Sequence, residues 1–435
     1  RATRFLYNAG IQEPFIYSCA DILKDTMGGT YNGLINKSEL IKETLKIEEN
    51  NYLNTLSKGL ELINKLTKSR NELSGENIFK LYDTYGFPSE IIQEIAVEKN
   101  LKLDLDTFND LMKSQKKQSR KYSKFDLSDT SFIDSNKNTI FSGYVDHELS
   151  SKVIGMYHNK KKIKNFDELN TELLVVVEST PFYPEGGGQI SDIGKIENDS
   201  CSLLVTNVQK INNVIVHQVT IESGSISIGD DIFLKINTKR REKIAANHSS
   251  THLLNQALRD VLGEHVEQKG SLVTDKYLRF DFSHNKTLTL EEIRKIETII
   301  SFEIDSDRDT RQKISSYKDA LKSGALAFFD EKYSDDVRVV NIGTKSMELC
   351  GGTHVSKTSS IRLFKILSES SVSTGIRRIE AITGEEAYHS YQTLYDKTKE
   401  ISKFLNVKPT DLHKKIIDMK ESESLKLTQF NELSK

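Results

Sequence analysis

The chain has 435 residues, and its 61 lysines and arginines nearly balance 63 aspartates and glutamates, for a net charge of −2. At roughly 150 residues per domain, this length predicts about three domains, each large enough to bury its own core. No run of about 18 apolar residues occurs, so we do not expect a membrane-spanning helix. The balanced charge argues against a protein that coats nucleic acid by bulk positive charge, but it does not exclude RNA binding through local basic patches.

The three cysteines, Cys19, Cys201 and Cys350, are far apart in the chain. An odd, dispersed set does not resemble a disulfide framework and predicts a reducing compartment, most simply the cytoplasm. The sequence starts at Arg1 without a methionine and without the apolar segment of a signal peptide, which favours an internal fragment.

Residues 1–128 are expected to be helical. Apolar residues recur there at three- and four-residue steps (Leu53, Leu56, Leu60, Ile63, Leu66), as in an amphipathic helix. A second helix is predicted over 76–82, and Pro88 favours the start of a third. The basic run 113–124 is either a solvated helix face or a segment that contacts phosphates.

Short strands are predicted over 129–238. A run rich in β-branched residues covers 173–177, and apolar residues alternate with polar ones over 214–216 and 232–236. Turn signals such as Gly224 separate these runs, so the segment is predicted to form a small barrel or sandwich.

Helices and strands mix over 239–388, which predicts an α+β domain. We expect helices over 242–262 and 290–304, and strands over 278–282, 337–342, 361–366 and 378–382. The charged segment 389–435 is predicted to be a helical connector. The expected fold is therefore multidomain, with an all-α region, a small β-barrel, an α+β domain and a helical tail.

Two histidine motifs are candidates for a metal site. His248 and His252 are four residues apart in a predicted helix, so both imidazoles lie on one face. Cys350-Gly351-Gly352-Thr353-His354 adds a thiolate and a third imidazole. Each motif alone is ambiguous, but together they predict a site that suits zinc better than magnesium or calcium. A metalloprotease is disfavoured because no glutamate follows the first histidine.

A glycine-rich loop is the third motif. Gly186, Gly187 and Gly188 allow the backbone to approach a ligand closely, and Gln189 offers both a donor and an acceptor. The loop lacks the lysine and the spacing of a phosphate-binding loop, so it is equally consistent with a flexible hairpin tip.

In combination these motifs resemble bacterial alanyl-tRNA synthetases. His248-Ser-Ser-Thr-His252, Cys350-Gly-Gly-Thr-His354, Phe182-Tyr-Pro-Glu-Gly-Gly-Gly-Gln189 and Leu81-Tyr-Asp-Thr-Tyr-Gly-Phe-Pro88 all occur in that family's order. The segments 268–273, 278–284 and 375–381 are also similar, and the resemblance weakens after about residue 390.

The resemblance implies the following domains: a helical tRNA-recognition region (1–128), a β-barrel of the editing region (129–238), a zinc-binding editing core (239–388) and a connector (389–435). It also implies that the aminoacylation domain is missing, so ATP and magnesium would serve only that absent part. The implied partner is tRNA(Ala), and self-association would involve the absent C-terminal domain.

By the same resemblance, the editing core hydrolyses mischarged Ser-tRNA(Ala) and Gly-tRNA(Ala), which an alanine pocket rejects poorly. The implied ligands of zinc are His248, His252, Cys350 and His354. Gln189 and Thr180 are expected to contact the substrate, and Cys350 is expected to be essential for hydrolysis. Four ligands would close a tetrahedron, so either one ligand is loose, the coordination expands, or zinc only positions the substrate.

Recognition of tRNA is expected at two places. By the same resemblance, Asp83 matches the family's acidic reader of the acceptor-stem G·U pair; the alternative is that it caps the turn before Gly86. Lys239, Arg240 and Arg241 are candidate phosphate contacts. The alternative to an editing enzyme is a non-catalytic tRNA-binding module whose zinc is structural.

Overall fold

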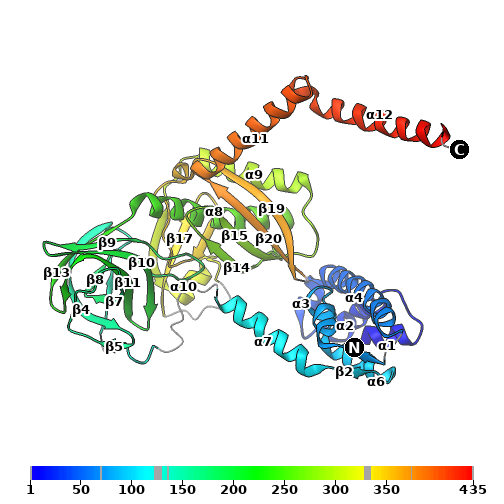
Figure 1. The fold of residues 1–435 in the computed structure, drawn as a ribbon, viewed down its shortest axis with the longest axis horizontal. Coiled ribbons are helices and arrows are strands. Elements are labelled where there is room, and N and C mark those ends of the chain that lie inside the picture. The colour runs from blue at the N-terminus through cyan, green and yellow to red at the C-terminus, as the bar shows by residue number, and fades with distance from the viewer. Residues whose placement is uncertain are drawn as a thin grey trace. The chain divides into compact units, whose positions relative to one another are not determined.

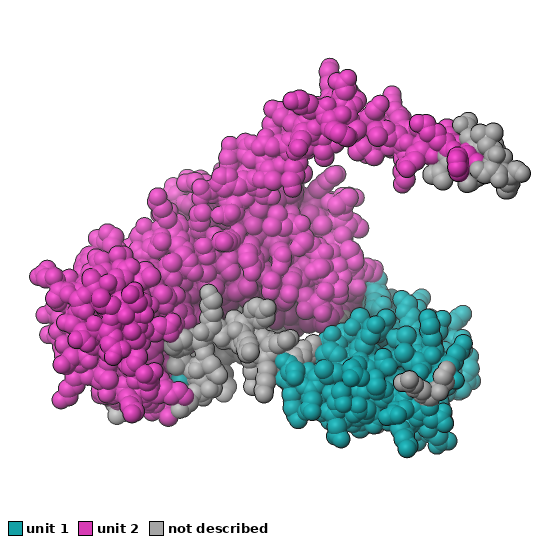
Figure 2. All heavy atoms as spheres, viewed as in Figure 1, with its two compact units in different colours: residues 1–130 teal, residues 131–435 magenta. Residues whose placement is uncertain are grey.

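A computed structural model describes residues 2–68, 71–121, 130–134, 137–327, 335–373 and 375–433. The chain divides into two compact units, residues 1–130 and 131–435 (Figure 2). Residues 122–124 of the basic run lie outside the described residues. Among the described residues, none of the helices combines the length with the apolar composition that a membrane span requires.

The first unit is built from helices (Figure 1). They are α1 (Ala2–Asn8), α2 (Cys19–Met27), α3 (Asn32–Asn36), α4 (Ser38–Thr67), α5 (Gly75–Asp83), α6 (Ser89–Glu98) and α7 (Leu105–Lys121). The predicted amphipathic stripe is confirmed, because Leu53, Leu56 and Ile63 of α4 are buried. The all-α expectation misses one detail: β1 (Glu72–Leu73) and β2 (Lys102–Leu103) form a short parallel pair.

A closed six-stranded barrel begins the second unit. Its order is β13-β9-β10-β11-β7-β4, and pairing between β13 and β4 closes it. The strands are β4 (Glu148–His158), β7 (Glu172–Val177), β9 (Gly194–Asn198), β10 (Cys201–Ile211), β11 (Val214–Gly224) and β13 (Asp231–Ile236). Alternating side chains fill the interior, as in β13, where Ile232, Leu234 and Ile236 are buried and their neighbours exposed. The predicted barrel is therefore confirmed.

The α+β part of the second unit surrounds the long helix α8 (Thr238–Leu262). One sheet has the order β14-β15-β20-β19, with β14 (Gln268–Val273), β15 (Leu278–Ser283), β19 (Phe364–Ser373) and β20 (Ile376–Thr383). A second sheet contains β16 (Arg311–Ser316), β17 (Asp336–Ile342) and β18 (Ser346–Leu349). Helix α9 (Leu290–Asp305) begins at a capping box formed by Thr289 and Glu292. Buried side chains of α8, α9 and both sheets form one core.

The predicted strand over 361–366 is only partly correct. A 3₁₀ turn occupies Thr358–Ile361, and β19 starts later, at Phe364. Arg362 lies between them with φ +68°, a left-handed conformation that interrupts a strand. Beyond β20 the chain continues as α11 (Gly384–Phe404) and α12 (Leu412–Leu433).

Candidate metal centre

The fold brings the two histidine motifs together. The ligand atoms of His248, His252, Cys350 and His354 all lie within 4.8 Å of one another. Cys350 Sγ is 3.4 Å from His248 Nε2 and 3.3 Å from His354 Nε2. His248 and His252 share one face of α8, while Cys350 directly follows β18. Segments about a hundred residues apart thus form one group of three imidazoles and one thiol.

Each imidazole has a polar side chain close to its Nδ1 atom. His248 Nδ1 is 2.7 Å from Gln189 Oε1, His252 Nδ1 is 2.7 Å from Glu348 Oε2, and His354 Nδ1 is 3.3 Å from Ser249 Oγ. With Nδ1 engaged in this way, the Nε2 atom of each ring faces the centre of the cluster. Metal-ligating histidines commonly have such partners, which fix the orientation and tautomer of the ring.

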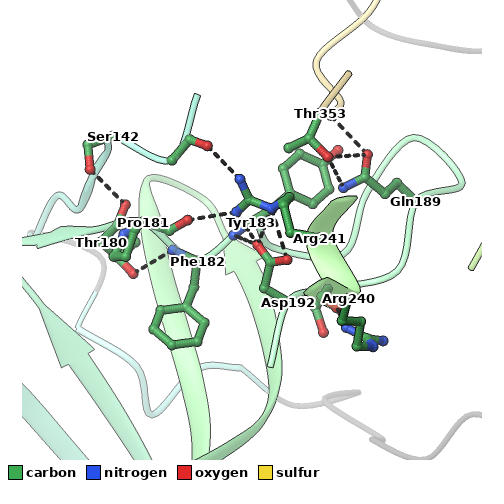
Figure 3. Close-up of polar contacts among 12 residues, drawn as sticks. Ser142, Thr180, Pro181, Phe182, Tyr183, Gln189, Asp192, Arg240, Arg241 and Thr353 are labelled. Atoms are coloured by element: carbon green, nitrogen blue, oxygen red, sulfur yellow. Dashed lines mark hydrogen bonds and ion pairs between the residues drawn. The ribbon is translucent and has the colours of Figure 1, made fainter. Parts of the chain in front are cut away.

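Gln189 is a fully buried part of this support. Its Oε1 accepts a hydrogen bond from the backbone N–H of Thr353 at 2.9 Å, and its Nε2 donates to Thr353 Oγ1 at 3.0 Å (Figure 3). Because a backbone N–H can only donate, Oε1 must be the acceptor, and His248 must donate from Nδ1. Gln189 therefore sets the tautomer of His248 and links the glycine-rich loop to the Cys350 motif.

The thiol and the imidazoles of the cluster shift one another's pKa values. Burial would raise the pKa of the Cys350 thiol, but His248, His354 and His252 outweigh it and hold that pKa well below its usual range. Burial would likewise lower the pKa of His252, yet Glu348 and Cys350 raise it to about 10. Burial dominates at His354 and lowers its pKa to about 3. A metal ion binds the thiolate and neutral imidazoles, so a cation in this cluster would displace the proton that His252 holds.

The donor set fits zinc. One thiolate and three imidazole nitrogens are ligands that zinc accepts in a tetrahedral arrangement, and magnesium and calcium favour oxygen instead. A Glu348 carboxylate that holds His252 also matches the support found around zinc-bound histidines.

A cavity of about 660 Å³ adjoins the cluster and is lined by His248, His252 and Cys350 on one side. Gly187 and Gly188 of the glycine-rich loop contribute to the lining. Gly188 O accepts from Val273 N at 2.7 Å, which fixes the loop to the end of β14. With φ +78° at Gly188, and Ser271 Oγ only 2.3 Å from where a Cβ would stand, a side chain is excluded there. The loop is therefore an anchored wall of the cavity.

Thr180 does not line the cavity beside the cluster. Its side chain is fully buried, and its Oγ1 is 2.8 Å from His217 Nε2. His217 Nδ1 is 3.2 Å from the Val175 carbonyl and must donate to it, so neutral His217 accepts from Thr180 at Nε2. A contact between Thr180 and a substrate stays a prediction, and it would require the hydroxyl to exchange this partner.

Burial of His217 predicts a pH dependence of stability. Burial lowers the pKa of His217 from 6.5 to about 4, although the hydrogen bond to Val175 opposes this. The unfolded chain binds the proton first, so the free energy of unfolding should fall as pH drops from 6.5 to 4, by roughly 3 kcal/mol. Urea unfolding at several pH values in this window measures the slope. The His217→Gln variant should have a shallower slope, and parallel slopes would contradict the prediction.

The three basic residues at the start of α8, Lys239, Arg240 and Arg241, lie in three different environments. Arg241 is buried, forms an ion pair with Asp192 and donates to the carbonyls of Gly143 and Pro181 (Figure 3). The prediction that Arg241 contacts phosphate is therefore wrong, because its guanidinium is used inside the protein. Arg240 is partly buried and donates to the Ser191 carbonyl at 2.7 Å.

Lys239 is exposed at the surface of the second unit. Asp83 is exposed in the first unit, at the C-terminal end of α5. Both positions remain open to solvent, so their predicted contacts with tRNA stay predictions.

The sequence interpretation missed the groups that hold the ligands. Glu348 precedes Cys350 by two residues and therefore shares its side of an extended segment, which is a signal that alternation along a strand offers. Ser249 of the first histidine motif contacts His354 of the second, and Thr353 of the second contacts Gln189 of the glycine-rich loop. These pairings join elements that are distant in sequence, so spacing alone cannot reveal them.

Comparisons with known proteins agree with this geometry. Residues 1–240 match the family described as tRNA synthetases class II (A), and residues 337–380 match the Threonyl and Alanyl tRNA synthetase second additional domain. The alanine–tRNA ligase of Alkaliphilus oremlandii is 39% identical over 447 residues, covering 100% of this chain and 50% of that protein. That of Cupriavidus necator is 40% identical over 419 residues, covering 95% of this chain and 48% of that protein.

The chain thus spans about half the length of the curated relatives it matches. The cavity lining draws on both matched regions, since Gly187 and Gly188 fall within 1–240 and Cys350 within 337–380, while His248 and His252 lie between the two regions. Because the class II (A) match covers more than half of the sequence, and these alanine–tRNA ligases are 39% and 40% identical to it along nearly its whole length, the chain belongs to the alanyl-tRNA synthetase family.

Proposed function

We propose that this chain is the tRNA-recognition and editing part of an alanyl-tRNA synthetase, and that it hydrolyses Ser-tRNA(Ala) and Gly-tRNA(Ala) at a zinc site. The observation that carries the proposal is the cluster of His248, His252, Cys350 and His354 beside a cavity walled by a glycine-rich loop.

The four clustered residues would hold zinc, which when bound supplies a Lewis acid that polarises water or an ester carbonyl. Gln189 and Glu348 hold His248 and His252 in fixed orientations, so the ligands are preorganised before a substrate arrives. The backbone of Gly187 and Gly188 can approach the aminoacyl ester, because no side chain intervenes.

Selectivity for serine over alanine requires polar groups that face the ester. Gln189 is buried and its Oε1 accepts from His248 Nδ1, so its contact with the substrate stays a prediction and would require the amide to exchange this partner. Gln268 and Ser271 of β14 line the cavity and carry polar side chains, and we assign them the recognition of the serine hydroxyl.

Deacylation assays test the proposal directly. Ser-tRNA(Ala) and Ala-tRNA(Ala) are incubated with the full chain, as metal-loaded protein and after removal of metal with a chelator. We expect hydrolysis that prefers the serine ester and is lost on metal removal and restored by zinc.

The alternative function, a tRNA-binding module with structural zinc, gives a different result. Metal removal should then unfold the α+β part, since a structural ion contributes directly to folding, and metal-loaded protein should bind tRNA without hydrolysing it. Circular dichroism and thermal unfolding of the metal-free chain distinguish the two cases.

A further inference from the structure

The turn that carries Cys350 is held by two side chains from outside its motif. Arg338 Nη1 donates to the carbonyls of Cys350, at 2.9 Å, and Gly352, at 2.8 Å. Tyr144 Oη donates to the carbonyl between them, that of Gly351, at 2.6 Å. Three consecutive carbonyls of a turn with two glycines are thus all bound by side chains.

Arg338 is itself fixed in place. It lies on β17, where its backbone carbonyl accepts from Cys350 N at 3.0 Å, so β17 and the turn are joined twice. Its Nε donates to Gln312 Oε1 at 3.1 Å. The guanidinium carbon lies 4.0 Å from the centre of the Tyr144 ring, a cation–π contact that couples the two side chains.

Tyr144 comes from the segment just before the first long barrel strand, and that segment is also anchored. Arg241 Nη1 donates to the carbonyl of Gly143 at 2.6 Å. A Cβ at Gly143 would stand 2.1 Å from the carbonyl oxygen of Pro181, so the backbone packs closely there. The Tyr144 ring also packs edge-on against Phe141, with centroids 4.9 Å apart. Arg241 therefore secures the backbone that presents Tyr144.

We propose that Tyr144 and Arg338 are positioning residues for the metal centre, and we name this pair the carbonyl clamp. A turn with two adjacent glycines has unusual conformational freedom, which metal binding would otherwise have to remove. The clamp holds the turn so that Cys350 Sγ already faces His248 and His354, 3.4 and 3.3 Å away. The segment that leads into the barrel thereby contributes Tyr144 to a site whose ligands all lie outside the barrel. The inference rests on the metal binding in the proposed function.

Metal affinity tests the carbonyl clamp without any use of activity. Zinc affinity is measured by competition with a chromophoric chelator on the full chain as wild type, Tyr144→Phe and Arg338→Gln. Loss of one hydrogen bond should weaken zinc binding by about fivefold in Tyr144→Phe, and loss of both Nη1 hydrogen bonds by about 10- to 100-fold in Arg338→Gln. Arg362→Gln is the matched control, because Arg362 lines the same neighbouring cavity as Tyr144 and Arg338. Among the described residues it makes no hydrogen bond to the turn.

Cobalt substitution provides a second measurement that a merely structural role would not change. The sulfur-to-cobalt charge-transfer band should shift or weaken in Tyr144→Phe and Arg338→Gln, because the position of Cys350 changes, and should stay unchanged in Arg362→Gln. Tyr144 is 41% exposed, so we expect Tyr144→Phe to fold. Wild-type affinity and spectrum in both variants would overturn the clamp alone. A wild-type chain that binds no metal would overturn the proposed function, and the clamp with it.

Discussion

Replacing Cys350 with alanine is expected to weaken zinc binding by more than about 100-fold, since loss of a ligand should exceed the 10- to 100-fold cost of losing a supporting partner. Deacylation of Ser-tRNA(Ala) should fall to the rate measured without metal. The thiol is the single sulfur ligand of the cluster and lies within 3.4 Å of two imidazoles. Metal content by mass spectrometry and the deacylation rate are measured on the same preparation.

Cys19→Ala is the control for this prediction, because Cys19 starts α2 in the first unit and is not part of the cluster. It should keep both the metal and the activity. A folded Cys350→Ala chain that deacylates at the wild-type rate would contradict the assigned role of the thiol.

Replacing Gly352 with alanine should be as damaging, although it removes no ligand. A Cβ at Gly352 would stand 2.0 Å from His248 Cε1 and 2.9 Å from Gln189 Oε1. The imidazole cannot move aside without breaking its 2.7 Å contact with Gln189 or leaving Cys350. We expect zinc affinity to fall by more than about 100-fold in a chelator competition assay, because the packed site has no space for the methyl group.

The neighbouring glycine offers a matched control. A Cβ at Gly351 would meet only Tyr144 Oη, at 4.0 Å, and its carbonyl would remain available to that hydroxyl. Gly351→Ala should therefore change zinc affinity by less than about threefold. Equal losses in the two variants would show that the turn, rather than the space beside His248, limits binding.

Much of the site was predictable because its residues form local patterns. Histidines four residues apart in a helical segment must share a face, and the Cys350 motif adds two further ligands in five residues. The barrel was predictable for a similar reason, since alternation along 232–236 records which side chains point inward. Arg362 marks the limit of such patterns, because its left-handed backbone interrupts a strand that apolar content alone had suggested.

The roles of the individual polar residues depend on contacts between segments that are distant in the sequence. Arg241 looked like a surface cation because its neighbours are basic, but Asp192 and two carbonyls surround it in the folded chain. Gln189 was singled out as a substrate contact, and in the folded chain its amide oxygen accepts from His248 Nδ1, a role that the sequence did not suggest. Residue type and spacing thus determined which chemistry the chain can support. Only tertiary packing decided which polar groups face the cavity and which hold the ligands, because a buried polar group takes its role from partners far away in sequence.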